Sequence, residues 1–189
     1  MRIAAFSTAS GADSVFNATG VVPRTFPPSS MGEFKREWLQ GYDLLYFHLH
    51  GLRNESHLYG DGWQMAMSAS QIRECDLFGT MAFIANCYGL GSKTERALLD
   101  AGCTAVVAGP GTNYAYRGGR VRGADLLGRY FISAFSRAQA VHSKTVDPIE
   151  ALRLAKIGLE LYLKSRNVIW RKFFSKPEWD ALEFQATTR

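Results

Sequence analysis

Cysteine is scarce in this 189-residue sequence, and its three cysteines show no pairing pattern. They stand at Cys75, Cys87 and Cys103, an odd number with no Cys-x-x-Cys spacing. A disulfide framework needs paired cysteines, and the common structural zinc sites need closely spaced ligands. We therefore expect neither disulfides nor a metal site, and a reducing compartment fits this cysteine usage best.

Long apolar runs are missing as well. No stretch approaches the ~20 consecutive apolar residues that a membrane-spanning helix needs. The first residues, MRIAAFSTAS, contain too short and too polar an apolar stretch for a signal peptide. We expect a cytoplasmic protein that does not associate with a membrane.

Motifs for nucleotides and nucleic acids are also absent. The net charge of +5 is mildly basic, but no stacking or groove-reading motif accompanies it, so we expect no nucleic-acid partner. The segment GLGSKT lacks the glycines of a phosphate-binding loop, because Cys87 and Ser92 stand six and one positions before Lys93. A tyrosine-phosphatase loop would require arginine where Lys93 stands.

What the sequence has is an alternation of short apolar runs and helix signals. Capping patterns such as Ser92-x-x-Glu95 and Asp147-Pro148-x-Glu150 mark helix starts. Residues 8–30 look like a loop, and residues 52–70 look like an insertion, for which a hairpin is one expected form. The expected strands are 3–6, 43–50, 81–85 and 103–108, and the expected helices begin near Ser29 or Ser30, Ser68 or Ser70, Ser92, Asp125 and Asp147.

Strands that alternate with helices are typical of an α/β fold, here a three-layer α/β/α sandwich with a mostly parallel sheet. No repeat or linker interrupts the chain, so we expect a single domain over residues 1–189. The C-terminal tail, about 167–189, is rich in aromatic residues and is expected to pack on the body of this domain. These aromatic residues are Trp170, Phe173, Phe174, Trp179 and Phe184.

Two of the expected strands end in reactive side chains. One ends in His50-Gly51 and the other in Cys87. If these strands are neighbours in a parallel sheet, the imidazole and the thiol meet at the same edge. The imidazole is then a general acid and base for a nucleophilic thiol, and nearby helix N-termini would favour the thiolate. The N–H groups of Gly51 and Cys87 could form an oxyanion hole.

The segments FHLHG, at 47–51, and FIANCYG, at 83–89, together resemble the pattern of caspase-fold cysteine peptidases. That group includes caspases, metacaspases, legumain, gingipains and the separase-like CHAT peptidases. The resemblance extends over roughly residues 43–165. It implies a caspase-like cysteine peptidase with Cys87 as nucleophile, His50 as acid and base, and Gly51 in the oxyanion hole. It implies no cofactor and a protein or peptide substrate, and it leaves room for an activating partner or a homodimer.

Some specificity residues of these families differ in this chain. Ala85 stands where metacaspases carry an acidic residue for a basic P1 side chain. Gly111, Thr112 and Asn113 follow the next strand, where CHAT peptidases of basic preference tend to carry Asp. We therefore do not expect Arg or Lys specificity. The candidates for substrate binding are Asn86, directly before the nucleophile, and a loop that suggests an acidic or phosphate-like partner through Arg117, Arg120 and Arg122.

Two other functions remain open. A caspase-like fold without turnover would serve as an interaction or regulatory module. A class I amidotransferase or DJ-1-like thiol hydrolase is the other, since ANCYG resembles the nucleophile segment GICYG. That scheme requires a downstream histidine, for which His142 is the candidate.

The remaining reactive residues have simpler expected roles. His48 is expected to be a packed or supporting histidine, and Cys75 and Cys103 structural core residues. Surface positions are expected for two further histidines, and a turn and a helix cap for two aspartates. These residues are His57, His142, Asp61 and Asp125.

Overall fold

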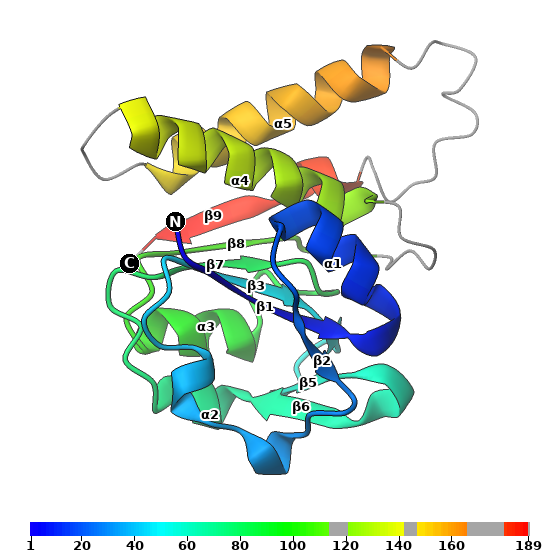
Figure 1. Cartoon of the computed structure of the whole chain (residues 1–189), viewed down its shortest axis with the longest axis vertical. Coiled ribbons are helices and arrows are strands. Elements are labelled where there is room, and N and C mark those ends of the chain that lie inside the picture. Colours follow the sequence, from blue (N-terminus) through cyan, green and yellow to red (C-terminus); the bar gives the residue numbers. More distant parts are fainter. Residues whose placement is uncertain (114–120, 142–146, 166–179, 189) are drawn as a thin grey trace.

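A six-stranded sheet forms the centre of the protein in a computed structural model that describes residues 1–113, 121–141, 147–165 and 180–188 (Figure 1). Its strand order is β2-β1-β3-β7-β8-β9. Every neighbouring pair is parallel except β8 and β9, which are antiparallel. The strands are β1 (Ile3–Thr8), β2 (Arg24–Phe26), β3 (Leu44–His48), β7 (Met81–Ile84), β8 (Ala105–Ala108) and β9 (Gln185–Thr188).

Helices cover both faces of this sheet (Figure 1). One face carries α1 (Ala12–Thr19), α4 (Gly123–Val141) and α5 (Pro148–Ser165), and the other carries α2 (Ala69–Arg73) and α3 (Lys93–Asp100). The predicted three-layer α/β/α sandwich with a mostly parallel sheet is therefore confirmed. In the described part of the chain, no helix has the length and apolar character needed to cross a membrane.

A small antiparallel sheet lies outside the main one, next to α2. It consists of β4 (His50–Gly51), β5 (His57–Tyr59) and β6 (Met65–Ser68), in the order β4-β5-β6. Residues 52–70 were expected to form an insertion with a possible hairpin, and β5 and β6 are that hairpin. The expected strand 43–50 is shorter than predicted, because β3 ends at His48 and His50 pairs with Tyr59 of β5.

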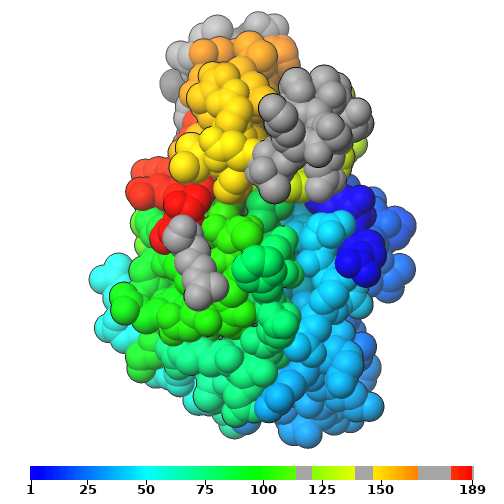
Figure 2. All heavy atoms as spheres, turned by 90° about the vertical axis from the view of Figure 1, so that its left-hand side faces the viewer, coloured from blue at the N-terminus to red at the C-terminus, as the bar shows by residue number. Residues whose placement is uncertain are grey.

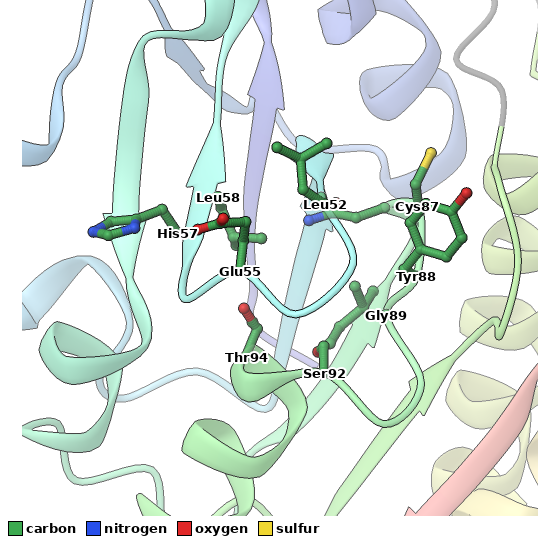
Figure 3. A pocket seen from close by; sticks show the side chains of 12 residues that line it. Leu52, Glu55, His57, Leu58, Cys87, Tyr88, Gly89, Ser92 and Thr94 are labelled. Carbon is green, nitrogen blue, oxygen red and sulfur yellow. The ribbon is translucent and has the colours of Figure 1, made fainter.

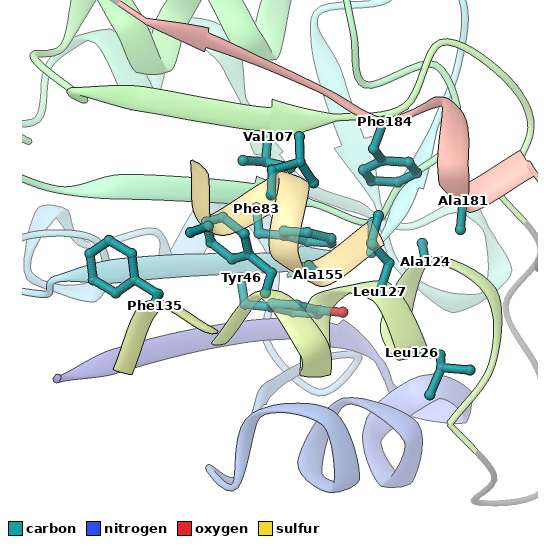
Figure 4. Packing of buried hydrophobic residues seen from close by; sticks show 14 of the residues in the cluster. Tyr46, Phe83, Val107, Ala124, Leu126, Leu127, Phe135, Ala155, Ala181 and Phe184 are labelled. Carbon is teal, nitrogen blue, oxygen red and sulfur yellow. The ribbon is translucent and has the colours of Figure 1, made fainter. Parts of the chain in front are cut away.

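Stacked aromatic rings fill the core between the sheet and α4 (Figure 4). The ring of Phe83 on β7 lies 5.2 Å from that of Tyr46 on β3, 5.6 Å from that of Phe131 on α4 and 5.5 Å from that of Phe184. All four side chains are fully buried, so this cluster holds helix, sheet and the C-terminal segment together.

The predicted loop over residues 8–30 is wrong, because it contains both α1 and β2. The buried face of α1 consists of Ser14, Val15, Ala18 and Thr19. These small, partly polar residues produce little helical hydrophobic pattern, so no strong signal for the helix is visible in the sequence. The helix expected near Ser30 is also different: two single 3₁₀ turns, η2 (Met31–Glu33) and η3 (Arg36–Trp38), take its place.

The capping predictions were more accurate. Ser68 and Ser92 are the N-caps of α2 and α3, and each accepts a backbone hydrogen bond from the first turn of its helix. The carboxylate of Asp147 accepts from the N–H of Ile149 at 2.9 Å, at the start of α5. Local side-chain to backbone bonds of this kind depend on few residues, which is why sequence reasoning finds them.

The last strand, β9, forms one edge of the sheet. The strand β9, red in Figure 2, reaches the surface between α5 and the layer below it. Phe184, directly before β9, is fully buried. The other aromatic residues of the predicted tail lie outside the described residues: Trp170, Phe173, Phe174 and Trp179.

The aromatic cluster gives a stability prediction. Phe83→Ala should lower the free energy of unfolding by about 3–5 kcal/mol, because it leaves a cavity among three other rings. Urea unfolding followed by circular dichroism measures this. Phe78→Ala is the matched control, since Phe78 is 84% exposed, and it should change the free energy little. Equal effects of the two substitutions would contradict a core centred on Phe83.

Candidate active site

The two strands that end in reactive residues are direct neighbours. β3 and β7 pair in parallel, with Phe47 opposite Ile84. Just beyond the ladder, the N–H of Ala85 donates to the carbonyl oxygen of Phe47 at 2.8 Å. The N–H of Leu49 then donates to Oδ1 of Asn86 at 2.7 Å. The two chains therefore leave the sheet side by side at its carboxyl edge.

Gly51 lies directly against the main chain of Cys87. A Cβ atom added at Gly51 would overlap the carbonyl oxygen of Cys87 and come within 3.4 Å of Cβ of Asn86. Any other residue at position 51 would push the two strand ends apart. Glycine here thus permits the segment that carries His50 to pack against the segment that carries Cys87.

The thiol of Cys87 is half-buried and bound to the main chain of Asn113. Its Sγ donates to the carbonyl oxygen of Asn113 at 3.1 Å and accepts from the N–H of Asn113 at 3.3 Å. The side chain of Asn113 is fixed in turn, because its Nδ2 donates to the carbonyl oxygen of Asn86 at 2.7 Å. Asn113 therefore positions the thiol, a role that sequence reasoning missed.

Burial raises the pKa of the Cys87 thiol, although hydrogen bonds from the N–H groups of Asn113 and Cys87 act in the opposite direction. The sequence had suggested that helix N-termini would favour the thiolate. Here burial outweighs the hydrogen bonds, because a buried thiolate loses its hydration. The raised pKa favours the protonated thiol at neutral pH.

His50 is half-buried, and its ring packs against that of Trp63 at a centroid distance of 5.1 Å. Burial lowers the pKa of His50, the charge of Asp61 raises it, and the charge of His48 lowers it, with a net lowering. The lowered pKa favours the neutral imidazole at neutral pH. A neutral imidazole can accept a proton, which is what a general base for a protonated thiol must do.

His48 faces the helix layer that contains α4 and binds a buried carboxylate there. Its Nδ1 lies 2.9 Å from Oδ1 of Asp125 on α4, which also accepts from the hydroxyl of Tyr46 at 2.7 Å. The other oxygen of Asp125 accepts from the hydroxyl of Ser14 at 2.6 Å. The expected helix-cap role of Asp125 is therefore wrong: this side chain is buried and joins α1, β3 and α4.

The charges of this pair stabilise each other. Burial alone lowers the pKa of His48, but the charge of Asp125, its hydrogen bond and the charge of Asp61 together outweigh this and raise the pKa. Burial alone raises the pKa of Asp125, but His48 and the hydrogen bonds from Ser14 and Tyr46 lower it. The supporting role predicted for His48 agrees with this geometry.

A small cavity lies beside Cys87, between the segment that follows β4 and the turn that leads into α3 (Figure 3). His57, which was expected at the surface, is half-buried and lines this cavity. The lining residues are Gly51, Leu52, Glu55, His57, Leu58, Ile84, Asn86, Cys87, Tyr88, Gly89, Ser92 and Thr94.

The other predicted residues lie elsewhere. Cys75 and Cys103 are buried, and burial raises their pKa values to about 11 and about 12. The carbonyl oxygen of Arg122 accepts from the N–H of Asp125 at 3.0 Å, at the start of α4. Asp61 stands in a turn, as expected, at the start of η4 (Asp61–Trp63). Arg117, Arg120 and His142 lie outside the described residues.

Comparison with solved structures places this architecture among known folds. The chain superimposes on gingipain R, an Arg-specific cysteine proteinase, with a TM-score of 0.57 and 10% identity over 98% of this chain and 45% of that one. It superimposes on the separase–securin complex of Saccharomyces cerevisiae with a TM-score of 0.58 and 12% identity, covering 99% of this chain and 12% of that one. The chain has a caspase-like fold.

A further match is the complex of the pro- and mature domains of RgpB from Porphyromonas gingivalis, with a TM-score of 0.56 and 10% identity. It covers 99% of this chain and 47% of that one, so the chain spans less than half the length of each of these three structures. No protein-family model matches the sequence, and no curated protein matches it. At such low identities, the likeness shows the fold.

Removing the buried carboxylate should destabilise the protein in a defined pH range. The raised pKa of His48 stabilises the folded protein at pH values below 6.5, the ordinary pKa of histidine. This stabilisation is lost as the pH rises through the pKa of His48 in the folded protein. The lowered pKa of Asp125 contributes above its ordinary value of 3.8, and this is lost as the pH falls through the folded pKa. Asp125→Asn should therefore lower the free energy of unfolding most between these two pH values, by about 3 kcal/mol.

Urea unfolding at pH 5 and pH 8 measures this loss. Glu150→Gln is the control, because Glu150 forms an exposed ion pair with Arg153 and should change stability little at either pH. A loss for Asp125→Asn that is independent of pH would rule out the charged His48–Asp125 pair.

The three cysteines should differ in reactivity. Iodoacetamide should alkylate Cys87 faster than Cys75 or Cys103, because only the first is half-buried and the other two are buried. Because the pKa of Cys87 is raised, its alkylation rate should still increase above pH 9.0, the ordinary value for cysteine. Peptide mapping by mass spectrometry measures the three rates, with urea-unfolded protein as the reference. A rate that levels off near pH 7 would contradict a protonated resting thiol.

Proposed function

We propose that this chain is a cysteine endopeptidase, in which Cys87 and His50 hydrolyse peptide bonds in protein substrates. The observation that carries the proposal is the contact of Gly51 with the main chain of Cys87. It brings the segment with the imidazole against the segment with the thiol, at the carboxyl edge of the sheet where α/β proteins bind ligands. The fold shared with gingipain R and separase supports the same reading.

In the proposed mechanism both groups begin uncharged. The neutral His50 accepts the proton of Cys87 as Sγ attacks the scissile carbonyl carbon. The N–H groups of Gly51 and Cys87 hold the oxyanion. His50 then gives the proton to the leaving amine, the C–N bond breaks, and a thioester remains on Cys87. Water, deprotonated by His50, hydrolyses the thioester and restores the thiol.

Substrate entry must change the surroundings of Cys87. In the structure the thiol donates to the carbonyl oxygen of Asn113, so this bond has to break when the proton moves to His50. Our candidates for substrate binding are still Asn86, Arg117, Arg120 and Arg122, with acidic groups as the expected partners of the arginines. Separase with securin and RgpB with its pro-domain are complexes with protein partners, which supports a protein partner here.

A second candidate function is a regulatory module without turnover. The observation that favours it is the same thiol contact, since a protonated thiol held by a carbonyl oxygen is a poor nucleophile. In that case wild type and Cys87→Ala would bind a partner equally, and neither would cleave it.

The proposal predicts cleavage that depends on two residues. Wild-type protein should cut a proteome-derived peptide library, and Cys87→Ala and His50→Ala should each reduce the cleavage rate by at least about 100-fold. Mass spectrometry of the products gives both the rates and the P1 preference.

Cys75→Ala is the matched control and should keep wild-type activity, because Cys75 is a buried core residue away from the strand ends. Cleavage that survives in Cys87→Ala would overturn the proposal. Release of ammonia from small amides, with all peptides intact, would instead favour the amidotransferase alternative.

A further inference from the structure

A turn of the small sheet folds back beside His50. His50 pairs with Tyr59 across β4 and β5, and the chain then turns through η4. Trp63, at the end of this turn, packs against the His50 ring at 5.1 Å and against the Tyr59 ring at 5.9 Å. The turn therefore packs against the imidazole through Trp63, and its first residue is the carboxylate Asp61.

Two hydrogen bonds attach Asp61 to the segment that directly follows strand β1. The N–H of Ser10 donates to Oδ2 of Asp61 at 2.7 Å, and the hydroxyl of Ser10 donates to Oδ1 at 2.7 Å. Ser10 belongs to η1 (Ala9–Gly11), which follows β1 directly. One side of the turn is thus bound to the same edge of the main sheet from which the His50 and Cys87 segments leave.

Backbone packing fixes the turn from the other side. Gly60 lies so close to the main chain of Phe26 on β2 that an added Cβ atom would overlap it. Its N–H donates to the carbonyl oxygen of Gln64 at 2.8 Å, which closes the turn. Because the turn is held on both sides, the carboxylate of Asp61 has a fixed position. It can act on His50 without first being ordered.

Three influences act on the charge of His50, and they differ in sign. Burial and the positive charge of His48 disfavour the protonated imidazole, whereas the negative charge of Asp61 favours it. Asp125 does not act on His50 in this way, since it is buried on α4 and bound to His48. Glu55 is exposed and lines the cavity beside Cys87.

We propose that Asp61 is the positioning residue of His50: its carboxylate, held by Ser10, stabilises the imidazolium that forms each time His50 takes up a proton. As a statement about catalysis, this rests on the proposed function. Asp61 touches neither the thiol nor the scissile bond in this scheme and exchanges no proton. It acts only while His50 is charged, after deprotonation of Cys87 and after deprotonation of the water.

The deciding experiment is a histidine NMR titration of the full chain. Asp61→Asn keeps the shape of the side chain and an oxygen that can accept from Ser10, but it removes the charge. It should lower the pKa of His50 below that of the wild type. Asp43→Asn is the matched control, because Asp43 is a carboxylate directly before β3, at the other end of this strand from His50. Its substitution should leave the His50 titration unchanged.

Kinetics separate positioning from a merely structural role. Asp61→Asn should lower kcat by about 10-fold with little change in KM, and Asp61→Glu should recover part of the loss. Ser10→Ala removes one of the two hydrogen bonds to Asp61 while keeping its charge, so it should give a smaller loss of kcat. Circular dichroism spectra that match the wild type show that each variant is folded.

The two readouts also separate this proposal from the proposed function. A lowered His50 pKa in Asp61→Asn, without hydrolysis by any variant, would support the coupling of Asp61 to His50 while the peptidase proposal fails. A His50 titration that is identical in wild type, Asp61→Asn and Asp43→Asn would overturn the role of Asp61, whether or not the protein cleaves peptides.

Discussion

A single buried carboxylate connects the parts of the molecule on which the candidate site depends. Asp125 on α4 accepts hydrogen bonds from Ser14 on α1 and from Tyr46 and His48 on β3. A buried charge without partners would cost several kcal/mol, so the three donors must stay in place for the fold to be stable. Because His48 stands two residues before His50, this network fixes the end of β3 from which the candidate base projects.

Close backbone approach at glycine positions completes this arrangement. A Cβ atom at Gly128 would come within 2.6 Å of the Tyr46 hydroxyl oxygen, so glycine lets α4 approach β3 near Asp125. Gly11 does the same beside the ring of His48, where an added Cβ atom would lie 2.9 Å from Nε2. At the site itself Gly51 allows contact with Cys87. Glycines at these three positions thus allow the helix layer, strand β3 and the two strand ends to pack closely against one another.

The sequence was sufficient for features that depend on neighbouring residues. Apolar runs located β3, β7 and β8, and serine caps located α2 and α3, because such signals lie within a few residues of each other. It failed for α1, whose buried face is made of small and polar residues. The sequence pattern also predicted that the segments with His50-Gly51 and Cys87 leave the sheet at one edge. The strands that precede them, β3 and β7, are parallel neighbours and end together.

What the sequence could not reveal is the set of contacts between distant residues. Ser14 and Asp125 are 111 positions apart, and Ser10 and Asp61 are 51 apart, so no local pattern joins them. Asp125 looked like a helix cap because it stands in the first turn of α4, where acidic residues are common. Only the packing of α4 on β3 shows that this side chain faces inward. The same holds for Asn113, whose main chain binds the Cys87 thiol across 26 positions.

The pKa shifts of the two candidate catalytic groups have one physical origin. Burial disfavours charge, so it raises the pKa of Cys87 and lowers that of His50. Both shifts favour an uncharged thiol and imidazole over a thiolate–imidazolium pair. Charge separation then has to occur during the reaction, when a substrate carbonyl is present to receive the electrons of the sulfur. A site of this kind depends on fixed groups that stabilise the transient charges: N–H groups for the oxyanion and a carboxylate such as Asp61 for the imidazolium.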